Sequence, residues 1–87
     1  MSNDWNLVLD EDAISQLLAA RAVDRRRLLA VLQNLKQDPY QAGDFIELDD
    51  TGRTLQVKLF GAYSVTWWPD SFVKEIRVVV IERIRSL

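Results

Sequence analysis

The sequence contains neither cysteine nor histidine, and both absences limit the metal sites and catalytic groups that the chain can have. Without cysteine the chain can form no disulfide and no thiolate metal site. Without histidine it lacks the commonest metal ligand and the commonest general base. A reaction centre would have to depend on Asp, Glu, Lys, Arg, Tyr or Ser, and we expect no metal and no cofactor.

Long apolar runs are also missing. No stretch is long enough to span a bilayer, and the first residues lack the basic and apolar segments of a secretion signal. We therefore expect a cytoplasmic protein without membrane association. The net charge of −2 argues against a dedicated nucleic-acid-binding protein, although Arg25–Arg27 and residues 74–85 are locally basic.

Only three glycines and two prolines interrupt the 87 residues, and 48% of the residues are hydrophobic. This length allows one globular domain, which we assign to residues 1–87. The pattern predicts a short strand over residues 5–9 and a helical region over residues 11–37. Two apolar stripes recur there at helical spacing: Ile14, Leu17, Leu18 and Ala22, then Leu28, Leu29, Leu32 and Leu35.

Asp10 is the predicted N-cap of the helical region, and Asp24 could cap a second helix. No glycine or proline separates the two stripes, so periodicity leaves both one long helix and two helices open. A lone long helix would have little to pack against in so small a domain, which favours an antiparallel hairpin. The arginine triplet at residues 25–27 fits a solvated helix face better than a phosphate site.

From residue 44 onward, apolar and polar side chains alternate. This period of two predicts strands near residues 46–49, 55–60, 63–68 and 76–81, with turns at Gly52 and at Gly61–Ala62. The predicted fold class is α+β in the order β-α-α-β-β-β-β. We expect Asp49, Asp50 and Asp70 to bond backbone groups in turns rather than to bind a metal.

A set of residues spread over these elements resembles the RelE/ParE toxin superfamily in order and spacing. The set comprises Leu35, Asp38-Pro39, Gly43, Gly52-Arg53, Leu55, Val57-Lys58-Leu59, Gly61, Tyr63, Val65, Trp67, Asp70 and Val78-Val79-Val80-Ile81. The resemblance implies a helical hairpin packed on one face of a curved antiparallel sheet. It also implies a toxin of a bacterial type II toxin–antitoxin pair, neutralised by an antitoxin protein that wraps across the sheet and helices. The RelE branch cleaves messenger RNA on the ribosome, and the ParE branch acts on DNA gyrase.

The cleaving branch surrounds the scissile phosphate with cations, which stabilise the charge of the transition state. Lys58 matches one of them, whereas its neighbour on the same face is Gln56, and Ser64 replaces the arginine of the family's Tyr-Arg pair. No tyrosine follows Arg83 and Arg85 at the end of the chain. Most of the family's catalytic residues are therefore absent. The candidates for a nuclease centre are Lys58, Arg53, Arg83 and Arg85.

Trp67 and Trp68 are consecutive strand residues, so their side chains should point to opposite faces of the sheet. We expect Trp67 in the core, whereas Trp68 could either pack on Thr66 or anchor a partner. We predict that a sheet face carrying Lys58, Trp68, Arg77, Arg83 and Arg85 docks an acidic or amphipathic antitoxin segment. Three functions follow: a toxin-like protein acting through protein contact, a divergent ribosome-dependent endoribonuclease, or a homodimer that covers Trp68 with its own copy.

Overall fold

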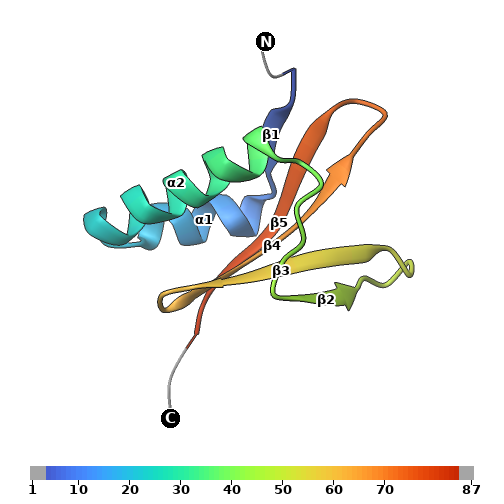
Figure 1. Cartoon of the computed structure of the whole chain (residues 1–87). Coiled ribbons are helices and arrows are strands. Elements are labelled where there is room, and N and C mark those ends of the chain that lie inside the picture. Colours follow the sequence, from blue (N-terminus) through green and yellow to red (C-terminus); the bar gives the residue numbers. More distant parts are fainter. Residues whose placement is uncertain (1–3, 85–87) are drawn as a thin grey trace.

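A computed structural model describes residues 4–84 of the chain (Figure 1). Its elements follow the predicted order, and the fold is α+β as expected. They are β1 (Asn6–Leu9), α1 (Glu11–Ala19), α2 (Ala22–Gln37), β2 (Phe45–Leu48), β3 (Thr54–Phe60), β4 (Tyr63–Asp70) and β5 (Glu75–Arg83). The helical region thus contains two helices. Neither described helix has the length and apolar character needed to cross a membrane.

The bend between α1 and α2 lies at Ala20 and Arg21, whose backbones are extended, with ψ angles of 149° and 152°. Asp10 is the N-cap residue of α1, as predicted. The N-cap of α2, however, is Arg21, and Asp24 lies in the first turn, where its charge favours the positive end of the helix dipole. The prediction that Asp24 caps the second helix was therefore wrong.

Arg25 explains how the chain bends without glycine or proline. Its guanidinium donates to three carbonyls at the end of α1, those of Leu17, Leu18 and Ala20, at 3.2, 3.0 and 2.9 Å. The last carbonyls of a helix have no partner within the helix, and a cation there also favours the helix dipole. One member of the arginine triplet is thus part of the hairpin.

The five strands form one sheet in the order β1-β5-β4-β3-β2. Strands β2 to β5 pair antiparallel with their neighbours, whereas β1 pairs parallel with β5. The sheet is therefore mixed rather than wholly antiparallel. Each of the three hairpins reverses the direction of the chain, so β5 runs opposite to β2. Strand β1 also runs opposite to β2, and it is therefore parallel to β5. Both helices lie on one side of the sheet, and β2 lies at the edge away from them (Figure 1).

The hydrophobic core lies between α2 and the middle of the sheet. Leu28, Leu32 and Leu35 of α2 are at most 1% exposed, and Trp67 of β4 is fully buried, as predicted. The core is completed by Ala13, Ala20, Val31, Tyr63, Val65, Ile76, Val78 and Ile81. The indole N–H of Trp67 has no hydrogen-bond partner among the described residues.

The turn at Gly61–Ala62 fixes the register of β3 against β4. Phe60 lies opposite Tyr63, and Lys58 lies opposite Val65. Residues opposite each other in a sheet share a face. Lys58 and Phe60 therefore belong to the helix-covered face, whereas Val57 and Leu59 belong to the other side, which we call the open face.

Candidate functional site

A groove between α2 and β3 is the candidate functional site, because it contains Lys58. Its volume is about 390 Å³. The lining residues from α2 are Arg27, Ala30, Val31 and Asn34, and those from β3 are Lys58 and Phe60. The groove thus has an apolar floor with cationic and amide side chains around it.

Helix α2 places Arg27 in this groove through its amphipathic pattern. Leu28, Leu32 and Leu35 are buried against the sheet, so the helix cannot rotate about its axis without exposing them. Arg27 and Asn34 are seven residues apart and therefore lie on the same side of the helix, two turns apart. That side borders β3, where Lys58 is half-buried.

Neither Arg27 nor Lys58 forms an ion pair with another residue among positions 4–84. A second hollow, of about 560 Å³, shares Arg27 and Phe60 with the groove and extends to Asp24 and Tyr63. Two uncompensated cations beside apolar surface suit an acidic group on an otherwise apolar ligand. Within residues 4–84 no cluster of acidic side chains is arranged to hold a metal ion.

Trp68 lies on the open face with two arginines. The guanidinium carbon of Arg53 is 4.0 Å from the centroid of the Trp68 ring, and that of Arg77 is 6.0 Å from it. Both distances are within the range of cation–π attraction. The ring is half-buried, and the same face also carries the buried apolar side chains of Leu55 and Val57.

The two arginines beside Trp68 are already paired with carboxylates. Arg77 contacts Glu75 at 2.9 Å and Asp70 at 3.6 Å, and Arg53 contacts Asp49 at 3.4 Å. Their charges are therefore partly neutralised within the chain. This cluster offers less attraction to an external anion than the groove that contains Lys58.

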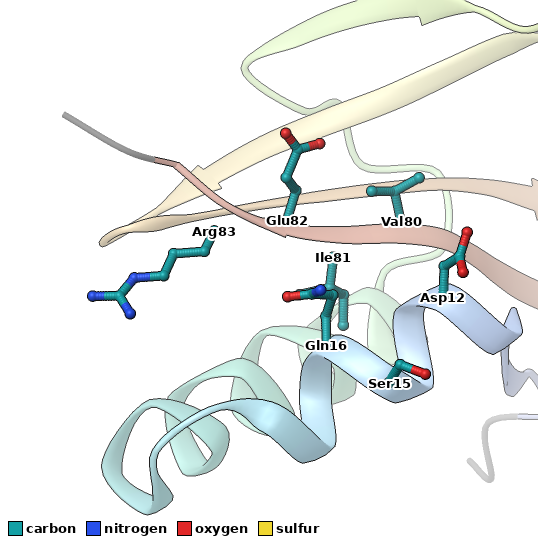
Figure 2. A pocket seen from close by; sticks show the side chains of 7 residues that line it. All are labelled: Asp12, Ser15, Gln16, Val80, Ile81, Glu82 and Arg83. Carbon is teal, nitrogen blue, oxygen red and sulfur yellow. The ribbon is translucent and has the colours of Figure 1, made fainter. Parts of the chain in front are cut away.

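Arg83 lies at the end of β5, opposite Tyr63, and therefore on the same face of the sheet as Lys58 but outside the groove. It lines a hollow of about 480 Å³ whose other walls include Asp12, Ser15 and Gln16 of α1 (Figure 2). Figure 2 shows Ile81 pointing toward α1, Glu82 on the opposite side of β5, and Arg83 extending away from the other side chains. The lining carries charges of both signs. Arg85 lies outside the described residues.

Comparisons with known proteins give different results for sequence and for structure. No protein-family model and no curated protein matches the sequence. The fold, in contrast, matches the isolated RelE toxin of E. coli with a TM-score of 0.79 at 13% identity, covering 95% of this chain and 87% of that one. The chain has a RelE-like fold. The resemblance noted in the sequence is thus confirmed for the fold.

Two further structures with the RelE-like fold were solved as complexes. The archaeal RelE–RelB complex of Pyrococcus horikoshii OT3 contains a chain that matches with a TM-score of 0.73 at 14% identity, covering 92% of this chain and 94% of that one. The toxin–antitoxin complex RelBE2 of Mycobacterium tuberculosis matches with a TM-score of 0.75 at 10% identity, covering 92% and 98%. At such low identities the likeness extends to the fold and not to the roles of individual residues.

In this RelE-like fold the predicted site residues do not share one face. Lys58 and Arg83 lie on the helix-covered face, opposite Val65 and Tyr63, whereas Arg53, Trp68 and Arg77 lie on the open face. The prediction of one docking face was therefore wrong for Lys58 and Trp68. Side-chain alternation assigns faces within a strand, but the relation between strands depends on their register.

Arg27 is the residue that sequence reasoning missed. Its signal was present in the spacing, because a two-residue turn at Gly61–Ala62 sets Lys58 opposite Val65, on the face that the helices cover. Arg27 lies beside the apolar residues of α2 that pack on this face, and it is therefore close to Lys58. The arginine triplet, considered alone, gave no such indication.

Proposed function

We propose that this chain is the toxin-like component of a type II toxin–antitoxin pair, and that it acts in the cytoplasm mainly through protein–protein contact. The main support for this proposal is the RelE-like fold, which extends over almost the whole chain. One chain with this fold was solved in a RelE–RelB complex and another in the toxin–antitoxin complex RelBE2. The groove lined by Arg27 and Lys58 supports this proposal. An amphipathic antitoxin segment could place apolar side chains on Val31 and Phe60 and a carboxylate between the two cations.

Co-expression with a small reading frame encoded beside this gene tests the proposal. We expect a stable complex that copurifies with the tagged chain. The double variant Arg27→Glu/Lys58→Glu should weaken it by roughly 10²-fold or more, since two carboxylates would replace the cations and repel the acidic group of the antitoxin. Arg26→Glu is the matched control, because Arg26 is exposed on the same helix but does not line the groove. Absence of any complex, or equal loss with Arg26→Glu, would count against the proposal.

A divergent ribosome-dependent endoribonuclease is the second candidate. Lys58 and Arg27 favour it, because two uncompensated cations in one groove are suited to a phosphate. The other candidate cations favour it less: Arg53 lies on the open face and is paired, and Arg83 is in a separate hollow. Induction in a bacterial host separates the two functions. Growth arrest with messenger-RNA cleavage that Lys58→Ala abolishes would establish the nuclease, and normal growth with intact messenger RNA would exclude it.

The homodimer through Trp68 has less support than either. Arg53 already lies over this ring, so the indole does not require a second copy to cover it. Sedimentation at micromolar concentration tests this function directly, and DNA gyrase supercoiling in the presence of the chain tests the remaining possible target.

A further inference from the structure

Strand β2 forms an edge of the sheet whose outer side has no partner within residues 4–84. The sheet order ends at β2, and all four of its residues are exposed. Phe45, Ile46 and Leu48 are 46%, 60% and 67% exposed. Proteins usually protect such an edge by keeping it short or with charged side chains, proline, a bulge or a covering element; β2 has four residues and one charge, Glu47. The sequence Phe45–Leu48 contains neither lysine nor proline.

The ladder between β2 and β3 determines which backbone groups point outward. The amide of Asp49 donates to the carbonyl of Arg53, and the amide of Asp44 donates to the carbonyl of Val57. Both carbonyls therefore point toward β2. The backbone N–H and C=O groups of the residues opposite them, Asp49 and Phe45, point toward β3. Backbone groups alternate in direction along an antiparallel strand. The N–H and C=O groups of Ile46 and Leu48 thus point away from β3, toward a side where none of residues 4–84 forms a strand.

The charges around this edge are mainly negative, and the cation of the following turn, Arg53, is paired with Asp49. Glu47 lies at its centre, and Asp50 follows in the turn; both are exposed, and neither forms an ion pair with a residue among positions 4–84. Glu47 shares the open face with Phe45, whereas Ile46 and Leu48 point to the other side. A strand lying beside β2 would therefore meet a carboxylate on one face and two aliphatic side chains on the other.

A second copy of the chain fits this edge poorly. The register that pairs every outward group sets Ile46 of one copy opposite Leu48 of the other. Glu47 then lies directly opposite Glu47 of the second copy, and like charges at such positions are destabilising. The charge at the edge instead complements a cationic strand.

We propose that β2 binds an extended segment of a partner protein in which Lys or Arg alternates with apolar residues. The segment adds a sixth strand: its backbone pairs with Ile46 and Leu48, its cations face Glu47, and its apolar side chains cover Ile46 and Leu48. The inference deepens the proposed protein–protein function, because it specifies the chemistry of a contact outside the groove of Arg27 and Lys58. It also differs from the acidic segment expected at that groove.

Two synthetic six-residue peptides test the proposal, one alternating Val with Lys and one alternating Val with Glu. We expect the Lys peptide to shift the backbone amide resonances of residues 45–50 and to bind roughly tenfold or more tightly than the Glu peptide. Absence of shifts at β2 up to millimolar peptide, or equal binding of both peptides, would overturn the proposal. So would shifts at β2 that depend on the concentration of the chain alone, because they would identify a second copy as the occupant.

Ile46→Pro removes one outward N–H while leaving the groups that bond β3, and Ile46→Thr is its matched control because it keeps that N–H. We expect Ile46→Pro to abolish binding of the Lys peptide and Ile46→Thr to retain most of it. If Ile46→Pro does not fold, Glu47→Lys provides a second test, and it should reverse the preference between the peptides. In the co-expression experiment, a complex that survives Ile46→Pro and Glu47→Lys unchanged would refute the edge site and leave the proposed function intact. Peptide binding at β2 without any complex in the co-expression experiment would support the edge site and count against the proposed function.

Discussion

At the scale of single residues, one guanidinium connects the two helices. Arg25 donates to three carbonyls of α1 across the bend. We expect Arg25→Ala to lower the free energy of unfolding by about 1–3 kcal/mol, because carbonyls at the helix end lose a charged donor. Arg26→Ala, on the same turn but exposed, should change it by less than about 0.5 kcal/mol. Urea denaturation of both variants provides the measurement, and equal effects would contradict this role of Arg25.

The carbonyl groups that Arg25 bonds could not be read from the sequence. Three consecutive arginines point in three directions around a helix, and only the position of the bend decides which of them faces α1. Periodicity did not locate the bend, because neither glycine nor proline marks Ala20 and Arg21. Trp67 could be assigned to the core from the sequence, because it shares the strand phase of the apolar residues Tyr63 and Val65.

At the scale of elements, Asp49 organises the turn between β2 and β3. One oxygen of its carboxylate accepts hydrogen bonds from the Thr51 hydroxyl at 2.6 Å and from the amides of Thr51 and Arg53, each at 2.9 Å. The hydrogen bond from the Thr51 side chain is the main cause that lowers the pKa of Asp49 below its ordinary value of 3.8. The prediction of aspartates bonding turn backbone is thus confirmed at this position.

A carboxyl whose pKa is lower in the folded state binds its proton more readily in the unfolded state. Its stabilising effect is therefore present above pH 3.8 and is lost as the pH falls through the lower folded value. We expect Asp49→Ala to melt at a lower temperature than the wild type at pH 7, with a difference that shrinks steadily below pH 4. Asp50→Ala controls for the removal of one negative charge. A difference between wild type and Asp49→Ala that does not change with pH would contradict this assignment.

At the scale of the whole molecule, stability depends on the contact between α2 and the sheet. Leu28 is fully buried, whereas its neighbour Leu29 is 42% exposed. We expect Leu28→Ala to cost about 2–5 kcal/mol, a large part of the total for a small domain, and Leu29→Ala to cost less than about 1 kcal/mol. Calorimetry of both variants measures the difference. Similar costs would mean that α2 packs with another face.

Periodicity and turn residues predicted the order of the elements, because each signal is local in the sequence. Two features of the whole molecule depended on contacts between distant residues instead. The parallel pairing of β1 with β5 joins Leu7 to Ile76, and no local pattern indicates it. The division of Lys58 and Trp68 between two faces depends on the register of β3 against β4, although the turn at Gly61–Ala62 held the information needed.

The open edge at β2 also bears on how the chain behaves during synthesis. An exposed strand edge with several apolar side chains can pair with the edges of other newly made chains and so favours aggregation. A partner that occupies β2 would remove this hazard, so solubility would depend on the ratio in which the two proteins are made. If β2 binds a partner as proposed, overproduction of this chain alone would lower its solubility.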